Sequence, residues 1–318
     1  MPRNATFSAI RVGARLTNAF VLDMIKMGGY GRDATDGLLL LAITQANLAP
    51  LIRDPVLQRT YATVDQPPPD ESRRPVSMNA LSNSLGIPFE TVRRRVASLA
   101  KDGVVEVTSR GVYLPQATVS SPFYRLALEV TYRLVGSLYH RLRDLGLLAN
   151  LPEPAAGAQP FDAPPVRLVA RLATAYLLRL AEPLKQHIGD MVTGLILMDI
   201  IGANTESLSD RERGTEEAGE AGFVTNDHRK PIKVAEIALR LSMPQETVRR
   251  HVNRLVRDEQ CVRVDEGYIV PAKVLARGPF VEFMQLSQSH LLRMFTAMAE
   301  YGVLADWDRQ RPGLQGAA

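Results

Sequence analysis

The chain has 318 residues, of which 46% are hydrophobic and 23% charged, so it can bury the cores of about two ordinary globular domains. Only 6% of the residues are aromatic, which argues against a stacking platform for single-stranded nucleic acid. The single cysteine, Cys261, excludes an intrachain disulfide and fits a reducing cytoplasm.

The first half of the chain predicts a series of helices and one hairpin. Apolar residues at helical spacing predict helices over 9–27 and 34–48. The polar, proline-rich stretch 64–75 predicts a loop or a disordered arm. The elements expected after this loop are a very short strand at 75–76, a helix over 78–84, a turn at 85–87, a helix from Pro88 to 102, a hairpin over 104–115 and a long helix over 122–146.

The second half repeats the first. Residues 73–115 and 229–271 align without a gap at an offset of 156, and 14 of the 43 positions are identical. The segments GLLLLAITQAN (37–47) and GLILMDIIGAN (194–204) match at an offset of 157. We infer an ancestral unit of about 155 residues that was duplicated and fused. The predicted organisation is a first repeat over 1–150, a linker over 151–165 rich in Pro and Ala, and a second repeat over 166–318.

Further helices and a second arm are expected around the repeated core. Helices over 166–186 and 280–302 would flank the second copy, as 9–27 and 122–146 flank the first. The stretch 206–231 is acidic and poor in apolar residues, so it predicts another loop or disordered arm.

Residues 80–94, ALSNSLGIPFETVRR, are followed by Gly103 and a predicted hairpin. This pattern resembles the DNA-binding domains of bacterial regulators of the GntR, IclR and MarR kinds. The resemblance implies a mainly α fold with small β-hairpin wings, in which two tandem winged helix-turn-helix domains cover about 33–115 and 190–271. It also implies that the helices carrying ETVRR are recognition helices, which enter the major groove of DNA.

Basic charge is concentrated in the two copies of the motif. Residues 73–115 have seven Lys or Arg and three Asp or Glu, while residues 229–271 have nine and six. The two segments therefore carry +4 and +3, and the rest of a chain with net charge +4 carries −3. An anionic polymer is the partner that such a distribution favours, although a solvated surface would also be basic.

A helical wheel centred on the apolar Val92 turns Glu90, Arg94, Ala97, Ser98 and Lys101 outwards, with Thr91, Arg93 and Arg95 on the flanks. In the second copy the outward set is Glu246, Arg250, Asn253, Arg254 and Arg257. Outward arginines can donate to guanine, outward asparagine can pair with adenine, and flanking groups suit phosphates. The resemblance points to the Thr-Val-Arg-Arg positions of both copies. The predicted DNA contacts are Thr91, Arg93, Arg94, Arg95, Ser98, Lys101, Arg110, Thr247, Arg249, Arg250, His251, Asn253, Arg254 and Arg257.

Two details of this surface stay open at the level of sequence. Glu90 and Glu246 either accept from cytosine or complement the helix dipole. The first wing carries Arg110 at its tip, whereas the second carries Asp265 and Glu266, so we expect the second wing to contact DNA less or to contact protein.

Nothing in the sequence indicates catalysis, a cofactor or a metal. The five histidines lack the spacing of metal ligands, and phosphate-binding loops and nucleophile elbows are absent. Cys261 is expected to be a buried strand residue rather than a redox sensor. Met24, Met27, Met284, Met294 and Met298 are expected in the core or between helices rather than in a ligand pocket.

The sequence thus predicts a sequence-specific double-stranded DNA-binding regulator of transcription. The alternatives are a plasmid-type replication initiator and a winged-helix interaction module of a chromosome-segregation complex. Homodimerisation through the flanking helices is possible, and any small-molecule effector is unknown. No signal peptide or membrane span is predicted, so we expect a cytoplasmic, nucleoid-associated protein without a membrane partner.

Overall fold

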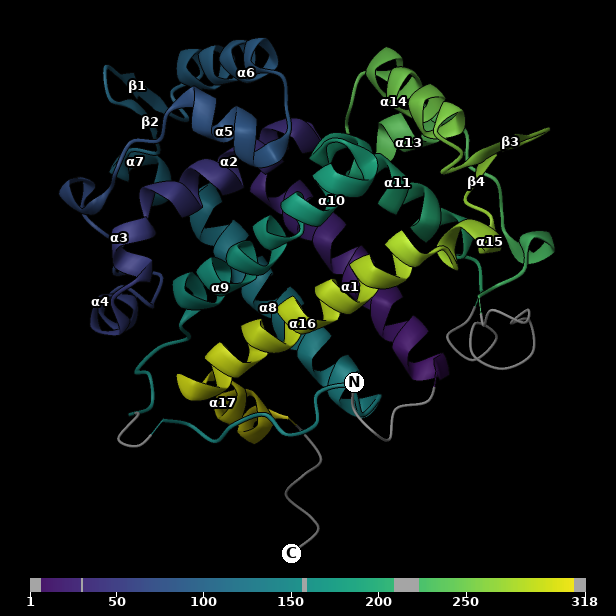
Figure 1. The fold of residues 1–318 in the computed structure, drawn as a ribbon. Coiled ribbons are helices and arrows are strands. Elements are labelled where there is room, and N and C mark those ends of the chain that lie inside the picture. Colours follow the sequence, from purple (N-terminus) through teal and green to yellow (C-terminus); the bar gives the residue numbers. More distant parts are fainter. Residues whose placement is uncertain (1–6, 30, 156–158, 209–222, 312–318) are drawn as a thin grey trace, which may run out of the picture.

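The first half of the chain follows the predicted order of elements. The computed structural model describes residues 7–29, 31–155, 159–208 and 223–311. In the first copy these residues form α1 (Phe7–Gly28), α2 (Ala34–Asn47), α3 (Ala49–Ile52), α4 (Pro55–Thr60), η1 (Asp70–Ser72), α5 (Met78–Leu85), α6 (Phe89–Lys101), β1 (Glu106–Thr108), β2 (Gly111–Tyr113), α7 (Gln116–Val119) and α8 (Pro122–Asp144), as Figure 1 shows.

The second copy repeats this order, and most of its elements are shifted by 156 residues. They are α9 (Val166–Arg179), α10 (Ala181–Ile188), α11 (Met191–Asn204), η2 (Asn226–His228), α13 (Val234–Arg240), α14 (Gln245–Arg257), β3 (Val262–Val264), β4 (Gly267–Ile269), α15 (Ala272–Leu275), α16 (Gly278–Glu300) and α17 (Val303–Gln310). The fold is mainly helical with two small antiparallel two-stranded sheets, as predicted. Most of the predicted arm 206–231 (residues 209–222) lies outside the described residues.

Each copy contains a small unit that we call a head: the first head is residues 34–119 and the second head is residues 191–275. In the first head, α5 and α6 are joined by a tight turn and followed by the hairpin β1–β2. The predicted short strand is reduced to a single bridge between Val76 and Val112, and its counterpart pairs Ile232 with Tyr268. The two heads therefore share one architecture.

A buried asparagine ties the hairpin of each head to its first helix. The Asn47 side chain donates to the carbonyls of Arg74 and Val112 at 2.8 and 3.1 Å, and its oxygen accepts from the Leu114 amide at 3.0 Å. Asn204 does the same for the second head. Full burial makes the loss of any of these bonds costly, which explains why the final Asn of the matched segments was retained.

The turn between the last two helices of each head needs a left-handed residue. Gly86 has φ 67° in the first head, and Ser242, at the equivalent position, has φ 52° in the second. A side chain strains this conformation, whereas glycine adopts it freely. The second head therefore carries strain at a position where the first has none.

We expect Ser242→Gly to raise the free energy of unfolding by about 0.5–1 kcal/mol, because relief of the strain exceeds the extra flexibility of the unfolded chain. Urea denaturation followed by circular dichroism measures the change. Ser289→Gly, at an exposed position within α16, is the matched control and should instead lose about 0.5 kcal/mol. Equal losses in both variants would contradict the expectation.

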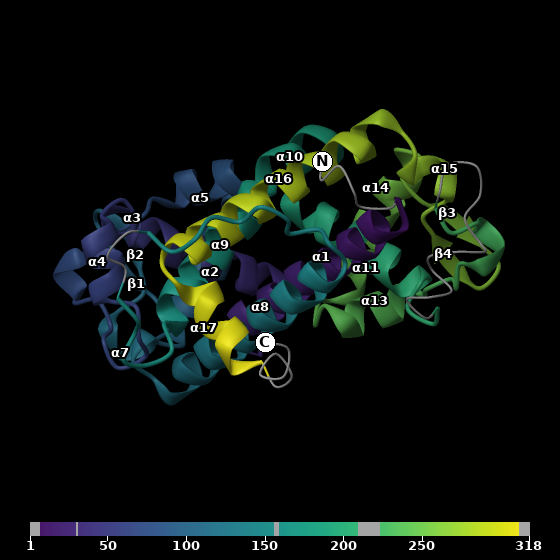
Figure 2. The same ribbon diagram turned by 90° about the horizontal axis from the view of Figure 1, so that it is seen from below.

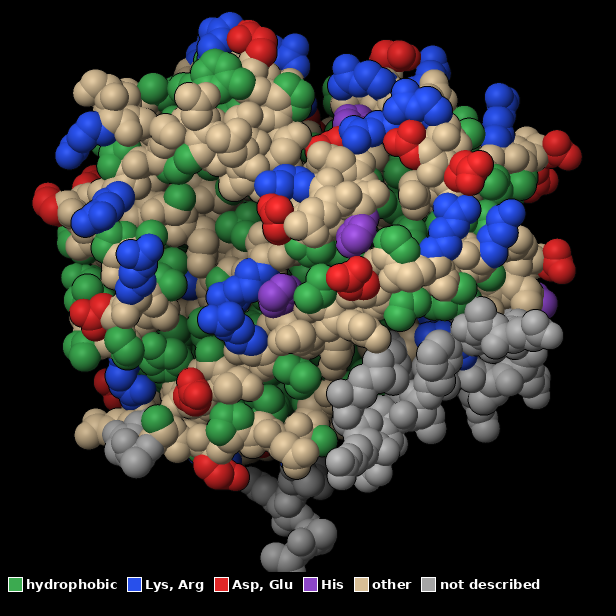
Figure 3. Space-filling model, viewed as in Figure 1, with side chains coloured by type: hydrophobic (Ala, Val, Ile, Leu, Met, Phe, Trp, Pro, Cys, Tyr) green, Lys and Arg blue, Asp and Glu red, His purple; other side chains and the backbone are tan. Residues whose placement is uncertain are grey.

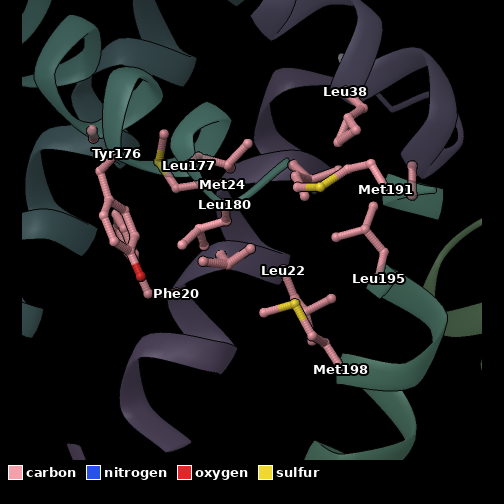
Figure 4. Close-up of a cluster of buried hydrophobic side chains, with 14 of the residues drawn as sticks. Phe20, Leu22, Met24, Leu38, Tyr176, Leu177, Leu180, Met191, Leu195 and Met198 are labelled. Atoms are coloured by element: carbon pink, nitrogen blue, oxygen red, sulfur yellow. The ribbon is translucent and has the colours of Figure 1, made fainter. Parts of the chain in front are cut away.

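The long helices join the two copies into one hydrophobic core. Helix α1 packs against α8 of its own copy and also against α11 of the other copy, while α9 packs against α16 and against α2 (Figure 2). The cluster in Figure 4 accordingly mixes residues of α1, α2, α9 and α11, such as Phe20, Leu38, Tyr176 and Leu195. The predicted repeat boundaries therefore do not separate two independent cores.

The contacts between the copies are reciprocal, as in an approximate two-fold arrangement. Phe20 and Tyr176, which occupy equivalent positions, lie with ring centroids 6.3 Å apart. The amide of Ala34, at the start of α2, donates to the Leu241 carbonyl of the second head, and the start of α11 lies beside Gly86 of the first head. As a result, α6 and α14 lie on the same side of the molecule in Figure 1.

Two details differ from the predicted elements. The helix expected over 166–186 is broken at Leu180, because Pro183 lacks the amide that would bond to residue 179. Helices α3, α4 and α17 were not predicted.

The flanking helices α1, α8, α9 and α16 bury apolar faces against one another within the chain, and a homodimer through them stays a prediction. No helix in the described ranges has both the length and the hydropathy to cross a bilayer.

Candidate nucleic-acid interface

Helices α6 and α14 each bury a predicted apolar stripe and expose the opposite face. Val92, Val96 and Leu99 are fully buried, as are Val248, Val252 and Leu255 in the second copy. Arg94 and Arg250, at the equivalent outward positions, are exposed. Figure 3 shows Lys and Arg side chains along the edge of the molecule that α6 and α14 form.

The neighbouring arginines are paired within their own helices. Arg93 Nε donates to Glu90 Oε2 at 2.9 Å, and Arg249 Nη1 donates to Glu246 Oε2 at 3.1 Å. The bond from Arg93 holds the pKa of the Glu90 carboxyl below its usual range. Exposed pairs of this kind contribute little to stability, so both arginines can exchange a carboxylate for a phosphate at low cost.

The remaining exposed residues of the predicted surface surround the two outward arginines. Thr91 and Thr247 are half-buried at the helix starts. Arg257 pairs with the adjacent Asp258 at 3.1 Å. The other exposed members on these helices are Ser98, Lys101 and Asn253.

Arg95, predicted on the flank of the helix, points towards the start of α2. Its guanidinium pairs with Asp33 and lies 3.2 Å from Asp36, at the start of α2. Asp33 is also the N-cap of α2 and accepts from the amides of Thr35 and Asp36. Arg95 therefore anchors α6 to the first helix of the head.

The side chain of Arg254 does not point outwards as predicted, because it reaches back across the domain surface. Nη1 donates to Asp190 Oδ2 at 2.7 Å and Nη2 donates to the Ile188 carbonyl at 3.0 Å. The guanidinium passes over Gly189, where a Cβ would lie 1.8 Å from Nη2. Arg254 thus anchors α14 to the N-cap of α11.

His251 completes this anchor. Its Nδ1 lies 2.7 Å from Thr193 Oγ1 in α11, and the ring is partly buried. Burial lowers the pKa of His251, and the nearby Arg250 and Arg254 lower it further, against the opposite effect of Asp190. The imidazole is therefore neutral near pH 7 and belongs to the packing of α14 rather than to a phosphate site.

The two copies use the same anchor with different residues. Arg95 in the first copy corresponds to His251, and Ser98 corresponds to Arg254, so the anchoring guanidinium has moved by one helical turn. Its carboxylate partner, Asp33 or Asp190, is the N-cap of the neighbouring helix in both copies. Sequence reasoning missed this role of the aspartates, although their alignment at an offset of 157 was a usable signal.

The tips of the hairpins agree with the predicted difference between the wings. Arg110 is exposed at the first tip, where its amide donates to Thr108 Oγ1, and Asp265 and Glu266 are exposed at the second. The exposed differences between the two surfaces include Ala97 against Asn253 and Arg110 against Glu266.

Cys261 is buried, as expected, and burial raises its pKa to about 12, which keeps the thiol protonated. Within the described ranges, no group of three His, Cys, Asp or Glu side chains could hold a metal ion.

Comparison of the chain with protein-family models, curated proteins and solved structures found no match.

Proposed function

We propose that the protein is a sequence-specific double-stranded DNA-binding regulator of transcription, in which each head is a winged helix-turn-helix. The order of α5, turn, α6 and hairpin supports this reading of the first head, and α13, α14 and the second hairpin support it for the second. A helix of this kind fits the major groove, while the hairpin beside it approaches the backbone.

One observation carries the proposal: Arg94 and Arg250 are exposed at equivalent positions on equivalent helices that lie on one side of the molecule. A guanidinium in this position can donate two hydrogen bonds to guanine. Arg93 and Arg249, one position earlier, are suited to phosphates. The reciprocal arrangement of the copies favours an inverted repeat of half-sites, with centres about one helical turn of DNA apart.

The two half-sites should be similar but not identical. Asn253 faces outwards where the first copy has Ala97, so the second half-site should prefer an adenine that the first does not require. The other differences between the two helices, Arg95 against His251 and Ser98 against Arg254, should not alter the base preference. The side chains of Arg254 and His251 are held by hydrogen bonds within the second head.

Selection of bound sequences from random duplex DNA tests the proposal. We expect an imperfect inverted repeat, and affinity that falls steeply with salt as phosphate contacts release counterions. Asn253→Ala should relax one half-site only. If the bound DNA shows no enriched sequence at any salt concentration, this result would contradict sequence-specific binding and favour an interaction module. Where the recovered sites lie in the genome, beside promoters or within iterated repeats, distinguishes a regulator from a replication initiator.

A further inference from the structure

A cavity of about 630 Å³ lies between α1, α10, α11 and α16. Its wall is mostly apolar and includes Leu180, Leu197, Met198, Phe280, Phe283 and Met284. The volume is in the range of sites that enclose small organic ligands. Of the methionines expected in the core, Met24, Met294 and Met298 are buried in the core. Met284 instead lines this cavity.

The charged residues in the described part of the cavity wall are basic. Arg11, Arg15 and Arg229 belong to it, and no Asp or Glu does. Arg229 is only 5% exposed; its Nε donates to the Val224 carbonyl at 3.2 Å, and its Nη1 has no hydrogen-bond partner. Burial lowers the pKa of Arg229 to about 10. A buried guanidinium without a carboxylate is costly, so an anionic partner would be strongly favoured here.

Two amide side chains of the wall add to this unused hydrogen-bonding capacity. Gln260 Oε1 and Gln288 Nε2 are buried without a partner. Buried polar atoms of proteins are nearly always paired, so these unpaired atoms in one wall are exceptions that call for an explanation. The wall thus combines a large apolar surface with a few polar groups, as ligand sites do.

The duplication supplies an internal control, because the equivalent space in the first copy is almost completely filled by side chains. It measures about 70 Å³ and is lined by Tyr124, Arg167 and Arg171, the counterparts of Phe280, Arg11 and Arg15. The Arg171 guanidinium donates to the carbonyls of Tyr61 and Gln58, both at 2.8 Å. Arg171, which belongs to α9 of the second copy, therefore holds the segment around Gln58 and Tyr61 of the first copy.

The counterpart of Arg229 is also fully satisfied in the first copy. Arg73 pairs with Asp70 at 2.7 Å and donates to the carbonyls of Leu114 and Pro68, both at 2.6 Å. The residue equivalent to Asp70 in the second copy is Asn226, whose oxygen instead accepts from the Ala272 amide. The second copy thus keeps the guanidinium and has lost its carboxylate.

We propose that this cavity binds an amphipathic carboxylate, with the apolar body between α1, α11 and α16 and the carboxylate paired with Arg229. The ligand would supply the negative charge that Asp70 supplies in the first copy. The wall of the cavity includes Ile188, whose carbonyl accepts a hydrogen bond from Arg254. A bound ligand would therefore touch the residues that anchor α14.

Isothermal titration calorimetry with decanoate and with decan-1-ol, which has the same chain length without the charge, tests the site. We expect wild type to bind decanoate at least about tenfold more tightly than decan-1-ol, as one charge-assisted pair can provide. Arg229→Met should lower decanoate affinity by about that factor and leave decan-1-ol binding unchanged. Met284→Trp, which fills the cavity, should weaken both ligands. Arg73→Met is the matched control in the first copy and should not alter the affinity for decanoate.

Circular dichroism establishes first that each variant is folded. Equal decanoate affinity in wild type and Arg229→Met, or no binding by wild type, would overturn the proposal. Binding that appears only after Glu216, Glu217 and Glu220 are replaced by glutamine would mean that the chain's own carboxylates take the place of the ligand, which also overturns it. No DNA is present in these titrations, so their outcome is independent of the proposed function.

Discussion

Replacing Arg94 and Arg250 together with alanine is expected to weaken binding to the selected DNA site by about 2–6 kcal/mol, which is roughly 30-fold to more than 10⁴-fold. Each guanidinium would lose a base contact worth about 1–3 kcal/mol. The two losses should add, because the residues lie on different heads and share no partner.

Fluorescence anisotropy with a labelled duplex measures this loss, at one fixed salt concentration. Thermal stability should stay unchanged, because both side chains are exposed and neither takes part in the anchors of α6 and α14. Arg133→Ala, at an exposed position on α8, is the matched control and should bind like wild type. A double variant that binds as tightly as wild type would exclude both helices as the DNA-reading surface.

The second large effect concerns the shared core. Phe20→Ala is expected to lower the free energy of unfolding by about 3–5 kcal/mol, because it leaves a cavity beside Tyr176 that the surrounding helices cannot close. The loss should affect both heads. Phe20 lies in α1, which packs against α2 of the first head and α11 of the second.

Hydrogen exchange of backbone amides separates a shared core from two independent ones. In Phe20→Ala, protection should fall in α6 and in α14 alike, since both heads are supported by the same cluster. Phe89→Ala, which truncates a phenylalanine that is 45% exposed, should change protection little in either head. Loss of protection confined to the first head would mean that the copies unfold as separate domains.

The proposed function and the proposed ligand site meet at the anchor of α14. Arg254 connects α14 to the carbonyl of Ile188, a residue of the cavity wall. The anchor of α6, Arg95 with Asp33 and Asp36, has no such neighbour, and the corresponding space is almost closed. If a ligand altered DNA affinity, its effect would therefore be expected at the second half-site.

The helical elements could be predicted well from local patterns. The helices over 9–27, 34–48 and 122–146, the hairpins and the buried stripe of Val92, Val96 and Leu99 follow from periodicity and from turn residues, which act over a few positions. The duplication made these predictions stronger, because two diverged copies had kept the same spacing. The break at Leu180 could also have been predicted from Pro183, because proline interrupts the hydrogen bonds of a helix.

What the sequence alone determined is the long helices and hairpins of each copy and the exposed arginine on each candidate recognition helix, because a 3.6-residue period decides which face of a helix is apolar. Only the tertiary structure decided which helices would meet. An apolar stripe does not determine which helix it packs against, so the contacts of α1 with α11 and of α9 with α2, which join the two copies, could not be predicted from the sequence. The roles of Arg95 and Arg254 were decided in the same way, because a long side chain can reach across to the start of a neighbouring helix that no helical wheel contains.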